Sequence, residues 1–368
     1  SQLKLGILSK YKHCFTNMFL YYTYFALYTI IWNARLLQNL LDLRQYDKII
    51  TIKPHNRVVS SPWFISEQNI LHLLLSQVIC HKQIEHIVLN RVEISNKSGD
   101  FRKFILVAIR ILIQPLYKKL LKNIFSGHKS TFKVMVPTVA KNMDILCSNI
   151  IKKCPDTVYF YFGEGKTVLS ELNNLYILIK YFLIKKGVTD LLVPEAKIIK
   201  ISLSVLSPIW REEKSHFTAD IFKNTIYDLT ESEVKLNILK SAQIINFLQH
   251  NKIQHILSYL DYHQFLSLGL EKLFDFCKLD FIVSQMSLGV TCVFGFLAQM
   301  TGVPSMLISH GSHILHTDRV ANLEHELIAN NMLFGGYRYL GIQTTFAMDF
   351  VLKKNVRSQS IVKIKPSI

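Results

Sequence analysis

The chain has 368 residues, of which 49 % are hydrophobic, and its mean hydropathy of +0.22 excludes an intrinsically disordered protein. Its 14 glycines and 9 prolines exclude collagen-like and low-complexity classes. Lysine and arginine outnumber aspartate and glutamate by 43 to 26, and the excess falls in residues 1–210, which hold 28 basic and 12 acidic side chains. This asymmetry predicts an anionic partner for the first part of the chain, such as anionic lipid, nucleic acid or a phosphorylated substrate. The alternative is an AT-rich genome that favours lysine codons.

Short apolar runs alternate with longer amphipathic segments along the whole chain. In the first part we expect strands at 48–53, 85–94, 132–136, 157–162 and 197–205, and helices at 66–80, 100–125, 140–153 and 167–186. In the second part we expect strands at 255–260, 280–284, 304–309, 339–343 and 360–365. A helix at 230–250 precedes them, another follows the first strand and ends at about 278, and the others lie at 287–301, 321–331 and 345–354. This alternation is typical of an α/β fold with doubly wound parallel sheets.

A polar break at 207–220, where the charge balance also changes, predicts a boundary between two domains. We expect a basic α/β region at 1–210 and a second α/β domain at 211–368. Six cysteines, none paired as C-x-x-C, predict reduced thiols in a cytosolic protein without structural zinc.

Two segments bear on membrane contact. Residues 14–34 carry no charge, but aromatic side chains lie through the middle of the stretch, which favours a buried or surface-lying helix over a span. Residues 101–143 hold nine basic side chains and no acidic one. Around Pro115 this segment predicts two helical runs, with Leu116, Leu120 and Ile124 on one face and Lys118, Lys119 and Lys122 on the other. Such a helix suits an anionic bilayer, or else packs its apolar face into the core.

The run FGEGKT at 162–167 resembles a phosphate loop at first sight. A P-loop needs a glycine where this chain has Phe160, so we reject that interpretation. What remains is a glycine turn between a strand and a helix, in which Lys166 is a candidate anion contact and Glu164 a candidate base. A plain strand-to-helix turn is the alternative.

Polar side chains follow the apolar strands of the second part. Because ligands of open parallel sheets sit beyond the carboxyl ends of the strands, these residues form the candidate site: Asp261, Ser284, Gln285, Ser287, His310, Gly311, Ser312 and His313. An imidazole can take a proton from a hydroxyl nucleophile, so we expect His310 to be a general base with Asp261 as its partner. A set of structural caps is the alternative. His313 and His316 have a spacing that metals accept, but nothing completes a metal site.

The second part also carries an ordered pattern of motifs: Asp280 before an apolar strand, then Gly289, Gly302-Val303-Pro304, Met306-Leu307-Ile308 and His310-Gly311-Ser312. This pattern resembles the acceptor-side Rossmann domain of GT-B glycosyltransferases. Bacterial enzymes that build capsule or lipopolysaccharide sugars, and polyol-phosphate polymerases, are similar around the last motif. The resemblance covers about residues 255–368. It implies a GT-B-like arrangement in which a donor-binding domain follows near Ile368, or in which residues 1–210 form an unusual partner domain.

The resemblance implies an enzyme that moves a sugar from a nucleotide-activated donor to a hydroxyl of a lipid-linked or polysaccharide acceptor. The nucleotide sugar would be a co-substrate, and neither a resident cofactor nor a metal is expected. The basic first part predicts a peripheral association with the cytoplasmic face of the inner membrane. The alternative function is a non-enzymatic basic module that binds anionic membrane or nucleic acid. Nucleic acid is disfavoured because the 39 phenylalanines and tyrosines lie mostly in apolar runs.

Overall fold

The computed structural model describes residues 11–52, 74–75, 79, 84–89, 98–125, 132–137, 141–154, 157–162, 167–185, 198–207, 254–309, 313–333, 335–354 and 360–364. The chain divides into two compact units. Unit 1 combines Ser1–Met18, Lys97–Arg211 and Tyr262–Ile368, and unit 2 combines Phe19–Asn96 and Glu212–Asp261. Each unit therefore takes segments from both sides of residue 211.

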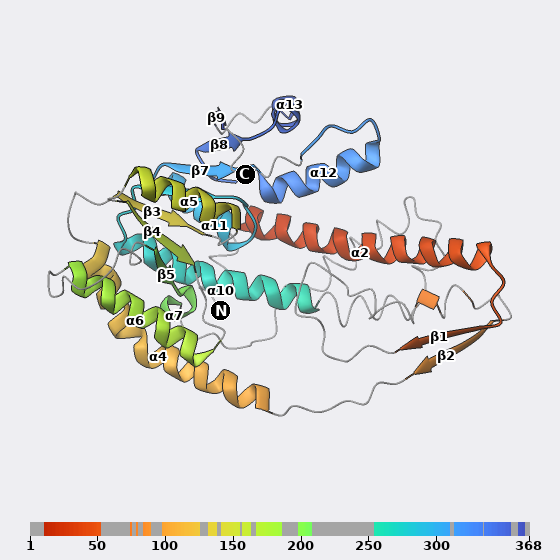
Figure 1. Cartoon of the computed structure of the whole chain (residues 1–368), viewed down its shortest axis with the longest axis horizontal. Helices are drawn as coiled ribbons and strands as arrows, with labels where there is room; N and C mark the ends of the chain where they lie inside the picture. The colour runs from red at the N-terminus through yellow and green to blue at the C-terminus, as the bar shows by residue number, and fades with distance from the viewer. Residues whose placement is uncertain are drawn as a thin grey trace. The chain divides into compact units, whose positions relative to one another are not determined.

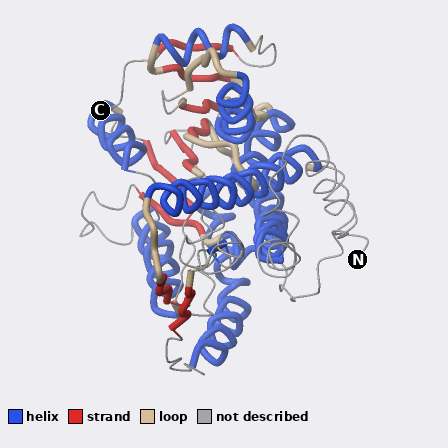
Figure 2. Tube along the Cα trace, turned by 90° about the vertical axis from the view of Figure 1, so that its right-hand side faces the viewer, coloured by secondary structure: helices blue, strands red, loops and turns tan. Residues whose placement is uncertain are grey.

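Unit 1 contains a seven-stranded sheet in which every neighbouring pair of strands is parallel (Figure 1). In chain order its strands are β3 (Phe132–Val136), β4 (Thr157–Phe162), β5 (Ile198–Ile201), β6 (Phe281–Ser284), β7 (Ser305–Ile308), β8 (Tyr339–Ile342) and β9 (Ser360–Lys363). Figure 2 shows these strands stacked between helices. The predicted α/β fold is thus confirmed at the level of a parallel sheet flanked by helices, and the strands predicted at 280–284 and 304–309 are parallel neighbours.

The strands lie in the order β5-β4-β3-β6-β7-β8-β9. The chain builds outward from β3 in one direction and, after β5, returns to build outward from β6 in the other. This is the order 3-2-1-4-5-6 of doubly wound sheets, extended by one strand. The two halves join where Val134 pairs with Phe281 and Met135 with Ile282. At the amino end of this junction, the Lys133 amide donates to Asp280 Oδ2 at 2.8 Å, and the Asp280 amide donates to the Lys133 carbonyl at 3.0 Å.

The helices of unit 1 cover both faces of the sheet, which explains why its strands are continuous apolar runs. They are α4 (Ser98–Phe125), α5 (Lys141–Lys153), α6 (Val168–Lys185), the short α7 (Leu203–Leu206), α11 (Val290–Thr301), α12 (Arg319–Met332) and α13 (Thr345–Lys353). Two further helices, α2 (Lys12–Leu43) and α10 (Gln254–Phe276), begin in one unit and end in the other.

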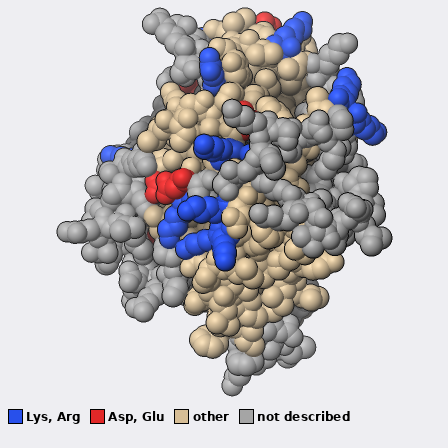
Figure 3. Space-filling model, turned by 90° about the vertical axis from the view of Figure 1, so that its left-hand side faces the viewer, with Lys and Arg blue, Asp and Glu red and all other residues tan. Residues whose placement is uncertain are grey.

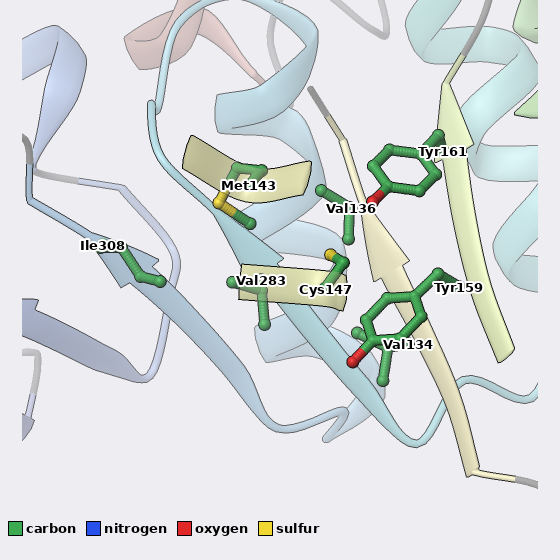
Figure 4. Packing of buried hydrophobic residues seen from close by; sticks show 8 residues of the cluster. All are labelled: Val134, Val136, Met143, Cys147, Tyr159, Tyr161, Val283 and Ile308. Carbon is green, nitrogen blue, oxygen red and sulfur yellow. The ribbon is translucent and has the colours of Figure 1, made fainter. Parts of the chain in front are cut away.

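The core of unit 1 shows the alternation of strand side chains directly. On one face of the sheet, a cluster from four strands packs against two side chains of α5, as Figure 4 shows: Val134, Val136, Tyr159, Tyr161, Val283, Ile308, Met143 and Cys147. Between Tyr159 and Tyr161, Phe160 points to the opposite face. There its ring meets that of Phe125 of α4, with 4.4 Å between centroids. The centre of the sheet is therefore buried on both sides.

Unit 2 contains a two-stranded parallel sheet of β1 (Lys48–Ile52) and β2 (Glu85–Leu89). Leu41, at the end of α2, packs with Leu75 and Ile79 into a small apolar cluster. Nearer the N-terminus of the same helix, the rings of Tyr24, Tyr28 and Trp32 stack in succession one helical turn apart. The described residues of this unit form no larger sheet.

The prediction of a strand at 255–260 is wrong, because these residues lie in α10. The run HILSYLD is short, and its buried residues Ile256, Leu257 and Leu260 fit the helical repeat that continues to Leu270. Similarly, the two runs predicted around Pro115 form one uninterrupted helix, in which Pro115 lies on the exposed side. Residues 14–34 lie in α2, and none of the helices in the described ranges is long and apolar enough to cross a bilayer.

Candidate binding site at the carboxyl edge of the sheet

In open α/β sheets, ligands bind at the carboxyl edge where the strand order reverses, since the loops on either side turn away from each other and leave a crevice. In unit 1 that point lies between β3 and β6. The chain leaves β3 at Val136 and Pro137, and it leaves β6 through residues 285–289. The end of β6 and this second loop contain three of the predicted site residues, Ser284, Gln285 and Ser287, all of which are buried.

The hydroxyls of the two serines differ in what they contact. Ser284 Oγ donates to the carbonyl of Met286 at 2.8 Å, so this hydroxyl stabilises the turn that ends β6. The Ser287 amide donates to the carbonyl of Asn331 at 3.1 Å, which ties the loop to α12. Ser287 Oγ is buried, makes no hydrogen bond of standard geometry to a described residue, and lies near enough to the Cys292 thiol to help lower its pKa, after the larger effect of Cys14. Ser284 therefore matches the capping alternative, whereas Ser287 makes no such cap.

The N-terminus of α11, directly after this loop, is closed by protein groups. The Val290 amide donates to His263 Nδ1 at 3.1 Å, and the Leu288 amide donates to Thr291 Oγ1 at 2.8 Å. The Cys292 amide donates to the carbonyl of Gly289 at 3.0 Å. A helix N-terminus binds phosphate through free amides, and these three are taken. An anionic group in the crevice must find its donors elsewhere.

His263, which was not among the predicted site residues, binds the N-terminus of α11 through its imidazole. Burial lowers the pKa of its imidazole from 6.5 to about 4, so the ring is neutral at pH 7 and its Nδ1 can accept from Val290. Glycine at 289 allows this approach, because a Cβ there would lie 2.4 Å from His263 Nδ1. Its φ of 58° also favours glycine. The only sequence signal was a histidine on an apolar helix, three residues before a buried position.

Loop 335–337 packs against Ser287 and the N-terminal half of α11. A Cβ at Gly335 would lie 2.0 Å from Ser287 Oγ, and one at Gly336 would lie 2.4 Å from the backbone nitrogen of Phe296 in α11. Tyr337 completes the contact, since its hydroxyl donates to the carbonyl of Thr291 at 2.7 Å. The loop after β6 is thus held in place by His263 of α10 and by residues 335–337.

The other predicted site residues have separate outcomes. Asp261 lies on α10, so the expectation that a strand end carries it is wrong. His313 follows β7 as expected, but it is buried, and its ring lies against that of Phe350 of α13 with 5.8 Å between centroids. Five further residues lie outside the described residues: His310, Gly311, Ser312, Glu164 and Lys166.

The carboxyl end of β5 carries a buried polar network that the sequence analysis missed. Glu171, in the first turn of α6, accepts at Oε1 from Arg110 of α4 at 2.8 Å and from Ser202 Oγ at 3.0 Å. Its Oε2 is buried and has no hydrogen-bond partner among the described residues. Tyr117 joins the network, because the Ser202 amide donates to its hydroxyl at 2.8 Å. One acidic residue in the apolar segment 168–185 was the available signal.

Metal ligation finds no support among the residues that the structure describes. No group of three histidine, cysteine, aspartate or glutamate side chains gathers there. His316 instead lies against His325, with 4.3 Å between ring centroids, and the five described cysteines are free thiols.

No protein-family model, no curated protein and no solved structure matches the chain.

Proposed function

We propose that the protein is a glycosyltransferase that moves a sugar from a nucleotide-activated donor to a hydroxyl group of a glycan or lipid-linked acceptor, as in capsule or lipopolysaccharide assembly. The observation that supports this most is the reversal of strand order between β3 and β6. Sheets with this topology bind their ligands, nucleotides among them, at the point where the strand order reverses.

The motif pattern of residues 280–314 supports the same proposal because its described members have places in one β–α–β unit. Asp280 bonds across the junction of the two half-sheets. Gly302 ends α11 with a left-handed φ of 72°, and the carbonyl of Pro304 accepts from the Ile282 amide at 3.0 Å. These residues therefore fix how β7 leads toward His310, the last motif of the resemblance.

In the proposed reaction, His310 takes the proton from the acceptor hydroxyl. The oxygen forms a bond to the anomeric carbon of the donor sugar, and the bond from that carbon to the phosphate oxygen breaks. The nucleotide leaves with the electron pair of that bond. Asp261, the predicted partner of His310, lies on α10 and not at a strand end, so its part in this reaction stays a prediction. The basic first part of the chain would hold the enzyme at the inner face of the cytoplasmic membrane, where lipid-linked acceptors lie.

Thermal unfolding with UDP, CMP and GDP tests the proposal. A nucleotide present at 100 times its Kd adds about 2.7 kcal/mol to the free energy of unfolding, which a thermal shift resolves easily. We expect one of the three to stabilise the protein. If none does, while vesicles of anionic lipid do, the protein is the non-enzymatic binding module.

The role of His310 is tested with the sugar forms of whichever nucleotide stabilises the protein. Loss of a general base lowers turnover by roughly 10²–10⁴-fold, so we expect that loss in His310→Ala and His310→Gln with an unchanged Tm. Transfer at the wild-type rate by well-folded variants would remove His310 from the mechanism. A drop in activity that only follows a drop in Tm would make the residue structural.

A further inference from the structure

Helices α4 and α6 of unit 1 turn large apolar side chains to solvent. On α4 these are Phe104, Val107, Ile111, Leu112 and Leu116, and on α6 they are Leu169, Leu172 and Tyr176. Phe104, Leu112 and Leu169 are 70 %, 77 % and 78 % exposed. Apart from the adjacent Ile111 and Leu112, successive members are three or four residues apart, which places each set on one side of its helix. We call these eight residues the α4/α6 face.

Both halves of this face lie on the same side of unit 1. The two helices contact each other and lie side by side in Figure 1. Arg110 of α4 and Glu171 of α6, which bond to each other at 2.8 Å, lie on the inward sides of their helices. Opposite them, the outward sides carry the apolar residues. An apolar surface that spans two adjacent helices is larger than the scattered single residues normal on soluble proteins.

Basic side chains border this face. Lys119 and Lys122, which are exposed, continue the outward side of α4 beyond Leu116, and Lys118 lies next to them. Burial, and then the charge of Lys118, lower the pKa of Lys272 on α10, so these ammonium groups are close enough to repel one another. From 101 to 125, α4 has no acidic residue, and the single acidic residue of α6 is the buried Glu171. Figure 3 shows Lys and Arg side chains grouped above a broad area without charge, with one acidic group at the border.

This combination favours a bilayer over a protein partner. Lysine is depleted in protein–protein interfaces, whereas juxtaposed lysines strengthen contact with anionic lipid. Long lysine side chains can also keep their charge at the level of the headgroups while apolar neighbours enter the acyl region. An anionic surface would attract these lysines, which an apolar protein surface would not.

We propose that the α4/α6 face is the surface by which the protein docks on an anionic membrane, with its apolar residues in the headgroup–acyl boundary and Lys119 and Lys122 against the lipid phosphates. The inference rests on the membrane association included in the proposed function, but not on glycosyl transfer. It excludes the uncharged segment 14–34 as the anchor. It also assigns the lysines and the apolar residues of α4 different roles: the lysines draw the protein to the surface, and the apolar residues hold it there.

Sedimentation with vesicles of 30 % phosphatidylglycerol in phosphatidylcholine measures the docking. Lys119→Gln with Lys122→Gln should weaken partitioning about 30-fold, which is about 1 kcal/mol for each lysine. Phe104→Ser and Leu112→Ser should each weaken it about tenfold. The matched controls are Phe346→Ser, since Phe346 of α13 is 68 % exposed, and Lys353→Gln on the same helix. Controls that weaken partitioning as much as the face variants would overturn the proposal.

Quenching by brominated lipid shows which surface enters the bilayer. The fluorescence of Leu112→Trp should be quenched by vesicles with bromine on the acyl chain, beyond the quenching seen in the wild-type protein. The fluorescence of Phe346→Trp should show no such increase. The reverse pattern would assign docking to another surface. If Leu112→Ser instead abolishes self-association in solution and leaves vesicle binding unchanged, the face is a contact between protein chains and the proposal is wrong.

The docking surface and the proposed function are tested by different outcomes. A wild-type protein that a nucleotide stabilises but that does not bind anionic vesicles would overturn the docking surface without contradicting the proposed transferase. Docking through this face without stabilisation by UDP, CMP or GDP would do the opposite.

Discussion

The imidazole of His263 couples the stability of the protein to pH. Its Nδ1 accepts from the first amide of α11 only while the ring is neutral, and burial holds its pKa at about 4, against 6.5 for a free histidine. Between these two values the unfolded chain binds a proton that the folded protein does not. The free energy of unfolding therefore falls as the pH falls from 6.5 to 4, by at most about 3 kcal/mol, and this group causes no further loss below pH 4.

Urea unfolding at pH 7.5 and pH 4.5 checks this prediction with His263→Asn beside the wild type. Asparagine offers an acceptor to the Val290 amide but does not titrate, so the variant should lose less stability on acidification. His13→Gln is the control, because His13 is an exposed residue of α2. An equal pH dependence in the wild type and His263→Asn would show that His263 does not titrate as proposed.

Other single residues show why the candidate site was only partly predictable. A serine or threonine after an apolar strand predicts a polar loop, but not which bond the hydroxyl makes. Thr344 and Ser284 proved to be local caps, with Thr344 Oγ1 accepting from the Ala347 amide at 3.2 Å. Ser287, which has the same local sequence character, carries a hydroxyl that makes no such cap. The difference depends on residues 331–337, which are distant in sequence.

At the scale of elements, α4 and α6 are joined by a buried ion pair. The side chain of Glu171 is fully buried and that of Arg110 is 18 % exposed. Because removal of one partner leaves the other charge buried and unpaired, we expect Glu171→Leu to lower the free energy of unfolding by about 3–5 kcal/mol. The double variant Arg110→Met/Glu171→Leu should be less destabilised than Glu171→Leu alone.

Denaturant unfolding of these variants is compared with Lys48→Met, which removes an exposed ion pair to Glu85 of equal length, 2.8 Å. That change should cost under about 1 kcal/mol, since solvent screens exposed pairs. A cost for Glu171→Leu no larger than that for Lys48→Met would mean that solvent reaches the pair on α4 and α6.

Elements were predictable to the extent that their hydrophobic period was unambiguous. The strands of unit 1 other than β5, and helices such as α5 and α6, lie within one or two residues of their predicted bounds, because glycine, proline or polar residues flank each apolar run. The strand predicted at 197–205 ends at Ile201, because Leu203–Leu206 form α7. Residues 255–260 failed because six residues with three apolar positions suit either period. The junction of β3 with β6 was not predictable, since no local pattern records which strands become neighbours.

For the whole molecule, the sheet makes the two parts of the sequence interdependent. A polypeptide of residues 211–368 would contain β6 to β9 but lack β3, leaving β6 as an uncovered edge without Val134 and Met135 beside it. We expect this fragment to show no cooperative thermal transition by circular dichroism, whereas the full chain should show one. A fragment that melts as cooperatively as the full chain would establish residues 211–368 as an autonomous domain.

The same junction sets a delay during synthesis. Lys133 and Asp280, which bond across it, are 147 residues apart in sequence. A ribosome that adds about 5–20 residues per second needs roughly 7–30 seconds to travel that distance. Throughout this interval β3, which becomes an interior strand, presents an open backbone edge on the nascent chain. The protein is therefore most vulnerable to aggregation before its translation ends, and a chaperone that covers β3 during this interval would raise the yield of folded protein more than one that acts after release.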